Sequence, residues 1–197
     1  MGLSISKQGT VSASGENVNP NLLAGSAISL FVNTDVSGST NLDYTIPDIS
    51  KLKAGTKLIV SCDIELYNVA TIRRIGCEPS FTSSSGNIMY VGIWTSDLSN
   101  RRCRIYSSVY TMAYDATGVG QRGIYVQGVT FNTGGYIRVS NPKLEIGTYP
   151  TPWCPHVNDA YYAGSNCGFF ESSNPYVIGA NTSFNKNFIV TKELIEI

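Results

Sequence analysis

The sequence predicts an all-β fold, and three observations support this class. Short runs of β-branched, aromatic and other apolar residues recur along the chain, each bounded by Gly, Asn, Ser or Asp. No pattern with the helical period lies between these runs. Only 14% of the residues are charged, against about 25% in a typical soluble domain. Strands at short spacing without intervening helices predict a sandwich or a barrel.

Six segments are expected to form strands. The first, Ala27–Val32, is short and mixed, and the second, Lys57–Tyr67, is long and alternates in its C-terminal half. Four more strands are predicted over Met89–Trp94, Arg102–Tyr106, Gly123–Val129 and Tyr136–Ser140. Ile49–Lys53 is expected to form at most one helical turn, and Lys192–Ile197 predicts either a last strand or a short helix.

Composition divides the chain into three parts. Residues 1–20 predict an N-terminal arm with one or two short strands, residues 21–159 the sandwich, and residues 160–197 a C-terminal arm with a terminal strand. Ser4–Ser12 aligns without gaps with Ser183–Thr191, either by chance or because both ends are strand-forming arms. An exposed strand offers unpaired backbone groups to a neighbouring subunit. The candidate assembly residues of the arms are Ile5, Val11, Phe169, Phe170, Phe184, Phe188, Ile189, Leu194 and Ile195.

Charge, hydropathy and cysteine spacing exclude several classes of protein. Lys+Arg and Asp+Glu number 14 each, so we expect no nucleic-acid partner bound by bulk phosphate neutralisation. No apolar run approaches the roughly 18 residues of a membrane span, and the N-terminus lacks the pattern of a signal peptide. The five cysteines are widely spaced and the chain has one histidine, which predicts reduced, mostly buried thiols and no metal site.

The motifs that resemble catalytic or cofactor sites lack their usual context. A Ser/His/Asp triad would need His156 with Asp159 as its orienting carboxylate, but no nucleophile elbow is present. Gly118–Gly123 matches the spacing of a dinucleotide fingerprint, yet a predicted strand follows it where a helix is required. We therefore expect no catalytic residue, no cofactor and no enzymatic activity.

Aromatic residues on the predicted strands and turns allow two interpretations. Tyr and Trp rings can stack on the C–H faces of a sugar ring while their polar tips bind its hydroxyl groups. They can equally fill the core or the rim of a sandwich. The candidate glycan-contact aromatics are Tyr90, Trp94, Tyr106, Tyr110, Tyr114 and Tyr125.

A family resemblance is carried by the segment Asn141–Asp159. Its motif residues are Lys143, Leu144, Glu145, Gly147, Thr151, Trp153, Pro155 and Asp159. This pattern resembles the "KLExG…T-x-W-x-P…D" ending of carbohydrate-binding-module-like jelly rolls in phage tail, fibre and other virion proteins. Asn21–Leu23 resembles the "NLL" opening of the same modules, and Phe188–Ile197 resembles short segments of phage structural proteins. Cys154 and His156 depart from the usual pattern, which has Thr and a small residue there.

The resemblance implies an antiparallel jelly-roll sandwich in a non-enzymatic virion structural protein, such as a fibre, decoration, neck or baseplate component. The implied partners are other virion proteins and copies of the same chain. A host-surface glycan is the alternative partner, if the module binds carbohydrate. The protein is then expected in the virion after synthesis in the host cytoplasm.

The segment Asn141–Asp159 is named the closing segment, and its prolines predict a structural lock. Pro150, Pro152 and Pro155 cannot donate to a β-ladder, so the chain is expected to run extended across a sheet end. The predicted lock consists of Trp153, Leu144 and Pro152, with Trp153 sealing the end of the sandwich. On this basis Trp153→Ala is expected to cost roughly 3–5 kcal/mol.

Overall fold

The computed structural model describes residues 4–5, 11–12, 18–120, 123–156 and 159. Over these residues the regular structure is almost wholly strand and every ladder is antiparallel, which confirms the predicted all-β sandwich class. The strands are β1 (Ser4–Ile5), β2 (Val11–Ser12), β3 (Leu30–Val32), β4 (Val36–Leu42), β5 (Lys57–Cys77), β6 (Ser80–Thr82), β7 (Ile88–Tyr90), β8 (Ile93–Thr95), β9 (Arg101–Tyr106), β10 (Tyr110–Thr111), β11 (Gly118–Val119) and β12 (Ile124–Ile146).

The long strands β5 and β12 form the centre of the main sheet. They pair antiparallel along most of their length. Strands β8, β9 and β10 pair with β5 on one side, and β3 and β4 pair with β12 on the other. The registers divide this sheet into two halves, ordered β9–β5–β12–β3 and β8–β5–β12–β4. Each long strand therefore belongs to both halves.

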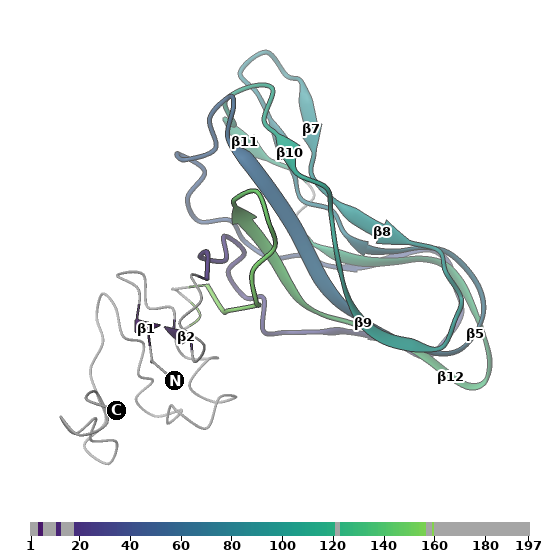
Figure 1. Ribbon diagram of the computed structural model, residues 1–197. Helices are drawn as coiled ribbons and strands as arrows, with labels where there is room; N and C mark the ends of the chain where they lie inside the picture. The colour runs from purple at the N-terminus through teal and green to yellow at the C-terminus, as the bar shows by residue number, and fades with distance from the viewer. Residues whose placement is uncertain (1–3, 6–10, 13–17, 121–122, 157–158, 160–197) are drawn as a thin grey trace, which may run out of the picture.

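A corner separates the two halves. Asn68 of β5 and residues 132–135 of β12 have no cross-strand partner in the register between the two strands. Asn68 has φ 48°, in the left-handed region that Asn tolerates better than most residues. A Cβ at Gly135 would collide with the Asn68 carbonyl oxygen, so only glycine fits there. Figure 1 shows β5 and β12 curving together at the end of the molecule where their labels stand.

Buried side chains from both halves form one hydrophobic core. Alternate residues of a strand point to opposite faces, so each half contributes every second residue to the same cluster. From β5 they include Leu58, Val60, Cys62, Ile64, Leu66, Ile75 and Cys77, and from β12 they include Ile124, Val126, Ile137, Val139 and Leu144. The two layers of the sandwich are thus continuous through β5 and β12.

The cysteines of the described residues are all free thiols, as the sequence predicts. Cys62, Cys77 and Cys154 are buried, and Cys103 is half-buried. Burial raises the pKa of the Cys62 thiol to about 12. Cys167 lies outside the described residues.

A second, smaller sheet has the order β11–β6–β7 and contributes the fully buried Phe81 to the core. The glycine-rich segment Gly118–Gly123 begins in this sheet, where Gly118 pairs with Thr82. It leads into β12, so a strand and not a helix follows it. The single turn expected over Ile49–Lys53 is present as a hydrogen-bonded turn in which the Leu52 N–H donates to the Ile49 carbonyl.

Little of the predicted arms falls within the described residues. The two short strands β1 and β2 pair with each other, with Ile5 opposite Val11. The C-terminal candidates Phe169, Phe170, Phe184, Phe188, Ile189, Leu194 and Ile195 lie outside the described residues. In the part of the chain that is described, no helix is long and apolar enough to cross a membrane.

Candidate functional site

A β-bulge near the end of β12 decides which side chains of this strand point into the core and which point away from it. The register with β5 shifts by one residue between Ser140 and Lys143, and Asn141 within this step has φ 51°. One extra residue exchanges the two faces of a strand. Leu144 therefore points into the sandwich core, whereas Lys143 and Glu145 point to the opposite face.

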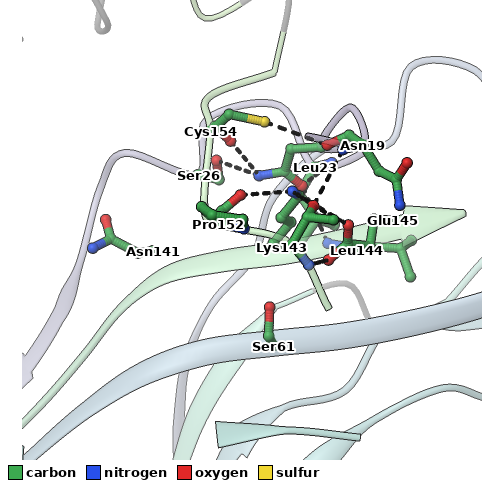
Figure 2. Close-up of polar contacts among 12 residues, drawn as sticks. Asn19, Leu23, Ser26, Ser61, Asn141, Lys143, Leu144, Glu145, Pro152 and Cys154 are labelled. Atoms are coloured by element: carbon green, nitrogen blue, oxygen red, sulfur yellow. Dashed lines mark hydrogen bonds and ion pairs between the residues drawn. The ribbon is translucent and has the colours of Figure 1, made fainter. Parts of the chain in front are cut away.

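Lys143 and Glu145 form an ion pair with no solvent exposure. Each side chain is 0% exposed, and Lys143 Nζ lies 3.3 Å from Glu145 Oε2. Thr151 Oγ1 accepts a hydrogen bond from Lys143 Nζ and donates one to Glu145 Oε2, and the Thr151 N–H donates to Glu145 Oε1 at 2.9 Å. Lys143 Nζ also donates to the Pro152 carbonyl oxygen at 2.7 Å. Figure 2 shows these groups gathered over β12.

The interior position of this pair affects the protonation of the lysine. Burial lowers the pKa of Lys143, and the neighbouring Glu145 carboxylate acts in the opposite direction. Two buried charges are tolerated only when their hydrogen-bonding groups are satisfied. The contacts with Thr151 and Pro152 supply those partners.

The buried Asn21 side chain connects three segments of the chain. Its Oδ1 accepts hydrogen bonds from the Leu23 and Leu144 N–H groups, both at 3.1 Å. Its Nδ2 donates to the carbonyl oxygens of Pro142 (2.9 Å) and Cys154 (3.1 Å), and also lies 3.0 Å from Ser26 Oγ. We name four side chains the closing network, because together they fix residues 151–154 to β12. They are Asn21, Lys143, Glu145 and Thr151.

The Asp159 carboxylate has a structural role. It accepts hydrogen bonds from the N–H groups of Gly25 (2.7 Å), Ser26 (3.3 Å) and His156 (3.3 Å). The last residue of the closing motif thereby binds the loop that follows the opening segment Asn21–Leu23.

The lock differs from the one predicted from the prolines. Leu144 is fully buried as expected, but the Pro152 side chain is exposed and Trp153 is half-buried. Polar contacts of Lys143, Glu145 and Thr151 hold the closing segment in place. The exposed Pro152 side chain therefore does not belong to the lock, whereas the contribution of Trp153 stays a prediction.

Because Trp153 is half-buried, Trp153→Ala is now expected to destabilise the protein by about 1–2 kcal/mol, below the range for a fully buried ring. Urea denaturation of the purified chain measures this cost. A loss above about 3 kcal/mol would show that the Trp153 ring is the main contact that closes the end of the sandwich.

Three exposed aromatic rings lie side by side near the corner of the sheet, and they are named the aromatic ledge. Phe31 of β3 is 49% exposed and Tyr67 of β5 is 46% exposed, with the half-buried Tyr136 of β12 between them. The Tyr136 ring centroid is 5.6 Å from that of Phe31 and 5.7 Å from that of Tyr67. The register explains the row, because Tyr67 and Tyr136 are direct cross-strand partners.

Charged residues fix the orientation of the ledge. The Tyr136 hydroxyl donates to Glu65 Oε1 at 2.8 Å, and this hydrogen bond raises the pKa of Tyr136. The guanidinium carbon of Arg138 lies 5.4 Å from the Phe31 ring centroid, within the range of a cation–π contact. Arg138 and Glu65 also form an ion pair, with Nη1 and Oε2 3.9 Å apart.

A surface pocket of about 250 Å³ adjoins the ledge. Its lining residues are Phe31, Asn33, Asn132, Gly134, Gly135 and Tyr136. Three of the six, Asn132, Gly134 and Gly135, come from the corner of β12, so the extra residues that bend the sheet also line the pocket. This volume lies just below the range of about 300–1,000 Å³ typical of drug-sized ligands, and it suits a smaller group.

The six aromatic residues singled out from the sequence do not form this cluster. Tyr90, Trp94, Tyr106 and Tyr114 are exposed, on β7, β8, β9 and a loop, and Tyr110 is half-buried against the core. Tyr125 is only 3% exposed, so it is a core residue and is withdrawn as a glycan contact. Trp94 packs under Arg74, whose guanidinium carbon is 5.6 Å from the ring centroid.

Among the described residues no group of three or more His, Cys, Asp or Glu side chains is placed to hold a metal ion. No protein-family model matches the chain, and no curated protein sequence matches it.

Solved structures do resemble the chain. The tripod from the baseplate of bacteriophage Tuc2009 aligns over 80% of this chain with 21% identity and a TM-score of 0.48. This chain covers 65% of the tripod chain, which is less than two thirds of its length. The C-terminal family 22 carbohydrate-binding module of Clostridium thermocellum Xyn10B aligns over 66% of this chain and 82% of its own, with 18% identity and a TM-score of 0.38.

A xylan-binding domain of family 22 aligns over 76% of this chain and 98% of its own, with 16% identity and a TM-score of 0.39. These likenesses are likenesses of fold. The chain is similar in fold to this phage baseplate protein and to these carbohydrate-binding modules.

Proposed function

We propose that this chain is a non-enzymatic structural protein of a bacteriophage virion, acting as a fibre, decoration, neck or baseplate component. One observation supports the proposal most directly. Lys143, Glu145, Thr151 and Asp159, which carry the resemblance to virion modules, are all buried and bonded within the chain. Charged residues used in this way stiffen a scaffold and are not available for chemistry on a substrate.

Assembly is proposed to use the arms. Subunits of such a protein join when strands and apolar side chains of one chain dock on another. The low charge density and the zero net charge support packing against copies of the same chain and against other virion proteins. The protein is proposed to be made in the host cytoplasm and to act in the virion.

Deletion of Phe188–Ile197 tests this proposal. We expect the shortened chain to be absent from assembled particles, because it lacks the apolar side chains proposed to dock on other subunits. Its melting temperature, measured beside that of the native chain, shows whether the deletion also disturbs the fold. Mass spectrometry of purified particles measures incorporation. A deleted chain that enters particles at the native level would contradict assembly through the C-terminal arm.

A second candidate function is carbohydrate binding at the host surface. The aromatic ledge and its pocket favour it, because exposed rings beside amide groups can bind both the faces and the hydroxyl groups of a sugar. The two roles are compatible in one virion protein, since they use different parts of the chain.

A further inference from the structure

We propose that the pocket beside the aromatic ledge binds one neutral pyranose ring of a carbohydrate. The inference rests on the carbohydrate-binding role above and gives that role a location and a class of ligand. It is carried by the shape, the charge and the rigidity of the pocket.

The composition of the pocket selects a neutral polar ligand. All six lining residues are uncharged: two aromatic residues, two asparagines and two glycines. Without a charge in the lining, neither an anion nor a cation gains an ion pair there. A purely apolar ligand would desolvate the two asparagine amides without replacing their hydrogen bonds with water.

The aromatic residues match the face of a pyranose. Phe31 and Tyr136 both line the pocket, and Tyr67, stacked on Tyr136, extends the aromatic surface beyond the lining. A pyranose presents C–H groups on its faces, and these pack on aromatic rings as apolar groups do. The rings need no induced movement, because the Glu65 hydrogen bond and the Arg138 contact already orient Tyr136 and Phe31.

The asparagines match the edge of a pyranose. A side-chain amide both donates and accepts hydrogen bonds, as a sugar hydroxyl does. Within the described residues, the side-chain amides of Asn33 and Asn132 make no hydrogen bond with protein groups, so both can engage a ligand. Space is available as well, because a Cβ placed on Gly134 would meet no atom within 4 Å.

Contacts on both sides hold the pocket in shape. Asp35, two residues beyond Asn33, accepts a hydrogen bond from the Phe131 N–H at 2.9 Å and ties the β3–β4 connection to β12. On the other side, Asn68 Nδ2 donates to the Thr133 carbonyl oxygen at 3.4 Å. A site held in its bound shape loses less entropy on binding.

Amide NMR of the full chain, titrated with neutral methyl pyranosides of glucose, galactose, mannose, N-acetylglucosamine and rhamnose, tests the inference. We expect saturable shifts of the Gly134 and Gly135 amides with at least one of these sugars. Tyr136→Ala is expected to weaken that binding at least tenfold, which corresponds to about 1.4 kcal/mol. Tyr136→Phe, which keeps the ring, is expected to retain it, and Asn132→Ala is expected to weaken it.

Tyr106→Ala is the matched control. Tyr106 is an exposed tyrosine far from the pocket, and its partner Ser61 lies six residues from Tyr67 on β5, roughly 20 Å along the strand. Tyr106→Ala is expected to leave the affinity for the neutral sugar unchanged. Methyl glucuronide gives the charged comparison, and tighter binding of that acid than of every neutral sugar would overturn the ligand class.

The outcomes separate this inference from the functions proposed above. Native binding to a neutral sugar that persists in a folded Tyr136→Ala chain overturns the location and leaves the carbohydrate-binding role standing. A native chain that shows no saturable shift with any of the sugars overturns the inference together with that role. Neither result bears on the proposed role as a virion structural protein, which the incorporation assay tests separately.

Discussion

Glu145→Ala is expected to destabilise the folded chain by about 3–5 kcal/mol, the largest effect we predict for a single polar residue. The substitution leaves the Lys143 ammonium in the interior without its counter-charge. It also removes the acceptor for the Thr151 N–H and hydroxyl. For a chain of this size the loss corresponds to a fall in melting temperature of about 10 °C. Thermal and urea denaturation followed by circular dichroism measure both quantities.

Lys53→Ala is the control for this prediction. Lys53 forms an ion pair with Asp115 at 3.2 Å, but more than half of each side chain is exposed. Exposed pairs contribute about 0–1 kcal/mol because water screens them. Equal costs for the two substitutions would show that the pair of Lys143 and Glu145 is not buried in solution.

Asn21→Ala is expected to cost about 3 kcal/mol or more. Four buried backbone groups lose their partner: the N–H groups of Leu23 and Leu144 and the carbonyl groups of Pro142 and Cys154. Each buried group left without a hydrogen bond costs about 1–3 kcal/mol, and partial access of water to the gap lowers the sum. Chemical denaturation measures the loss.

The exposed Asn41 provides the matched control for Asn21. Its side chain donates to Asp43 Oδ1 at 3.2 Å on the surface, so Asn41→Ala is expected to change stability by less than about 0.5 kcal/mol. If Asn21→Ala is as mild as Asn41→Ala, the three segments are held together by other contacts.

Sequence patterns predicted the strands in which apolar and polar residues alternate. Arg102–Tyr106 and Lys57–Tyr67 both fall within observed strands, β9 and the first half of β5. The second half of β5 and strand β4 were not predicted. β4 has the sequence VSGSTNL, which is typical of a turn, and it is a strand because β12 supplies its hydrogen-bonding partner.

The corner was beyond prediction for a related reason. Asn68 and Gly134 end a strand in sequence-based reasoning, because both residues favour turns. In the structure they bend two paired strands without ending them, since the neighbouring strand continues on both sides of the corner. Only the pairing between distant segments distinguishes these two cases.

The buried charges illustrate the limit of binary patterning. Lys143 and Glu145 alternate with Leu144 and Ile146, which predicts one polar face toward water. The closing segment covers that face, and the two charges are buried because they satisfy each other and Thr151. The closing motif contains Lys143, Glu145 and Thr151, but the motif alone does not show that their side chains contact one another.

The aromatic ledge depends on cross-strand register as well. Alternation from Ile64 and Leu66 places Tyr67 on the outer face of β5, so one ring was within reach of sequence reasoning. That Tyr136 and Phe31 lie beside it follows from the registers of β12 with β5 and β3, which a single sequence does not contain.

A double-mutant cycle between Lys143 and Glu145 measures how strongly the buried ion pair stabilises the fold. The single variants Lys143→Met and Glu145→Leu are each expected to be strongly destabilising, because each leaves one buried charge alone. The double variant is expected to be more stable than the sum of the two losses predicts, by at least about 2 kcal/mol. Additive losses, within about 0.5 kcal/mol, would contradict the account.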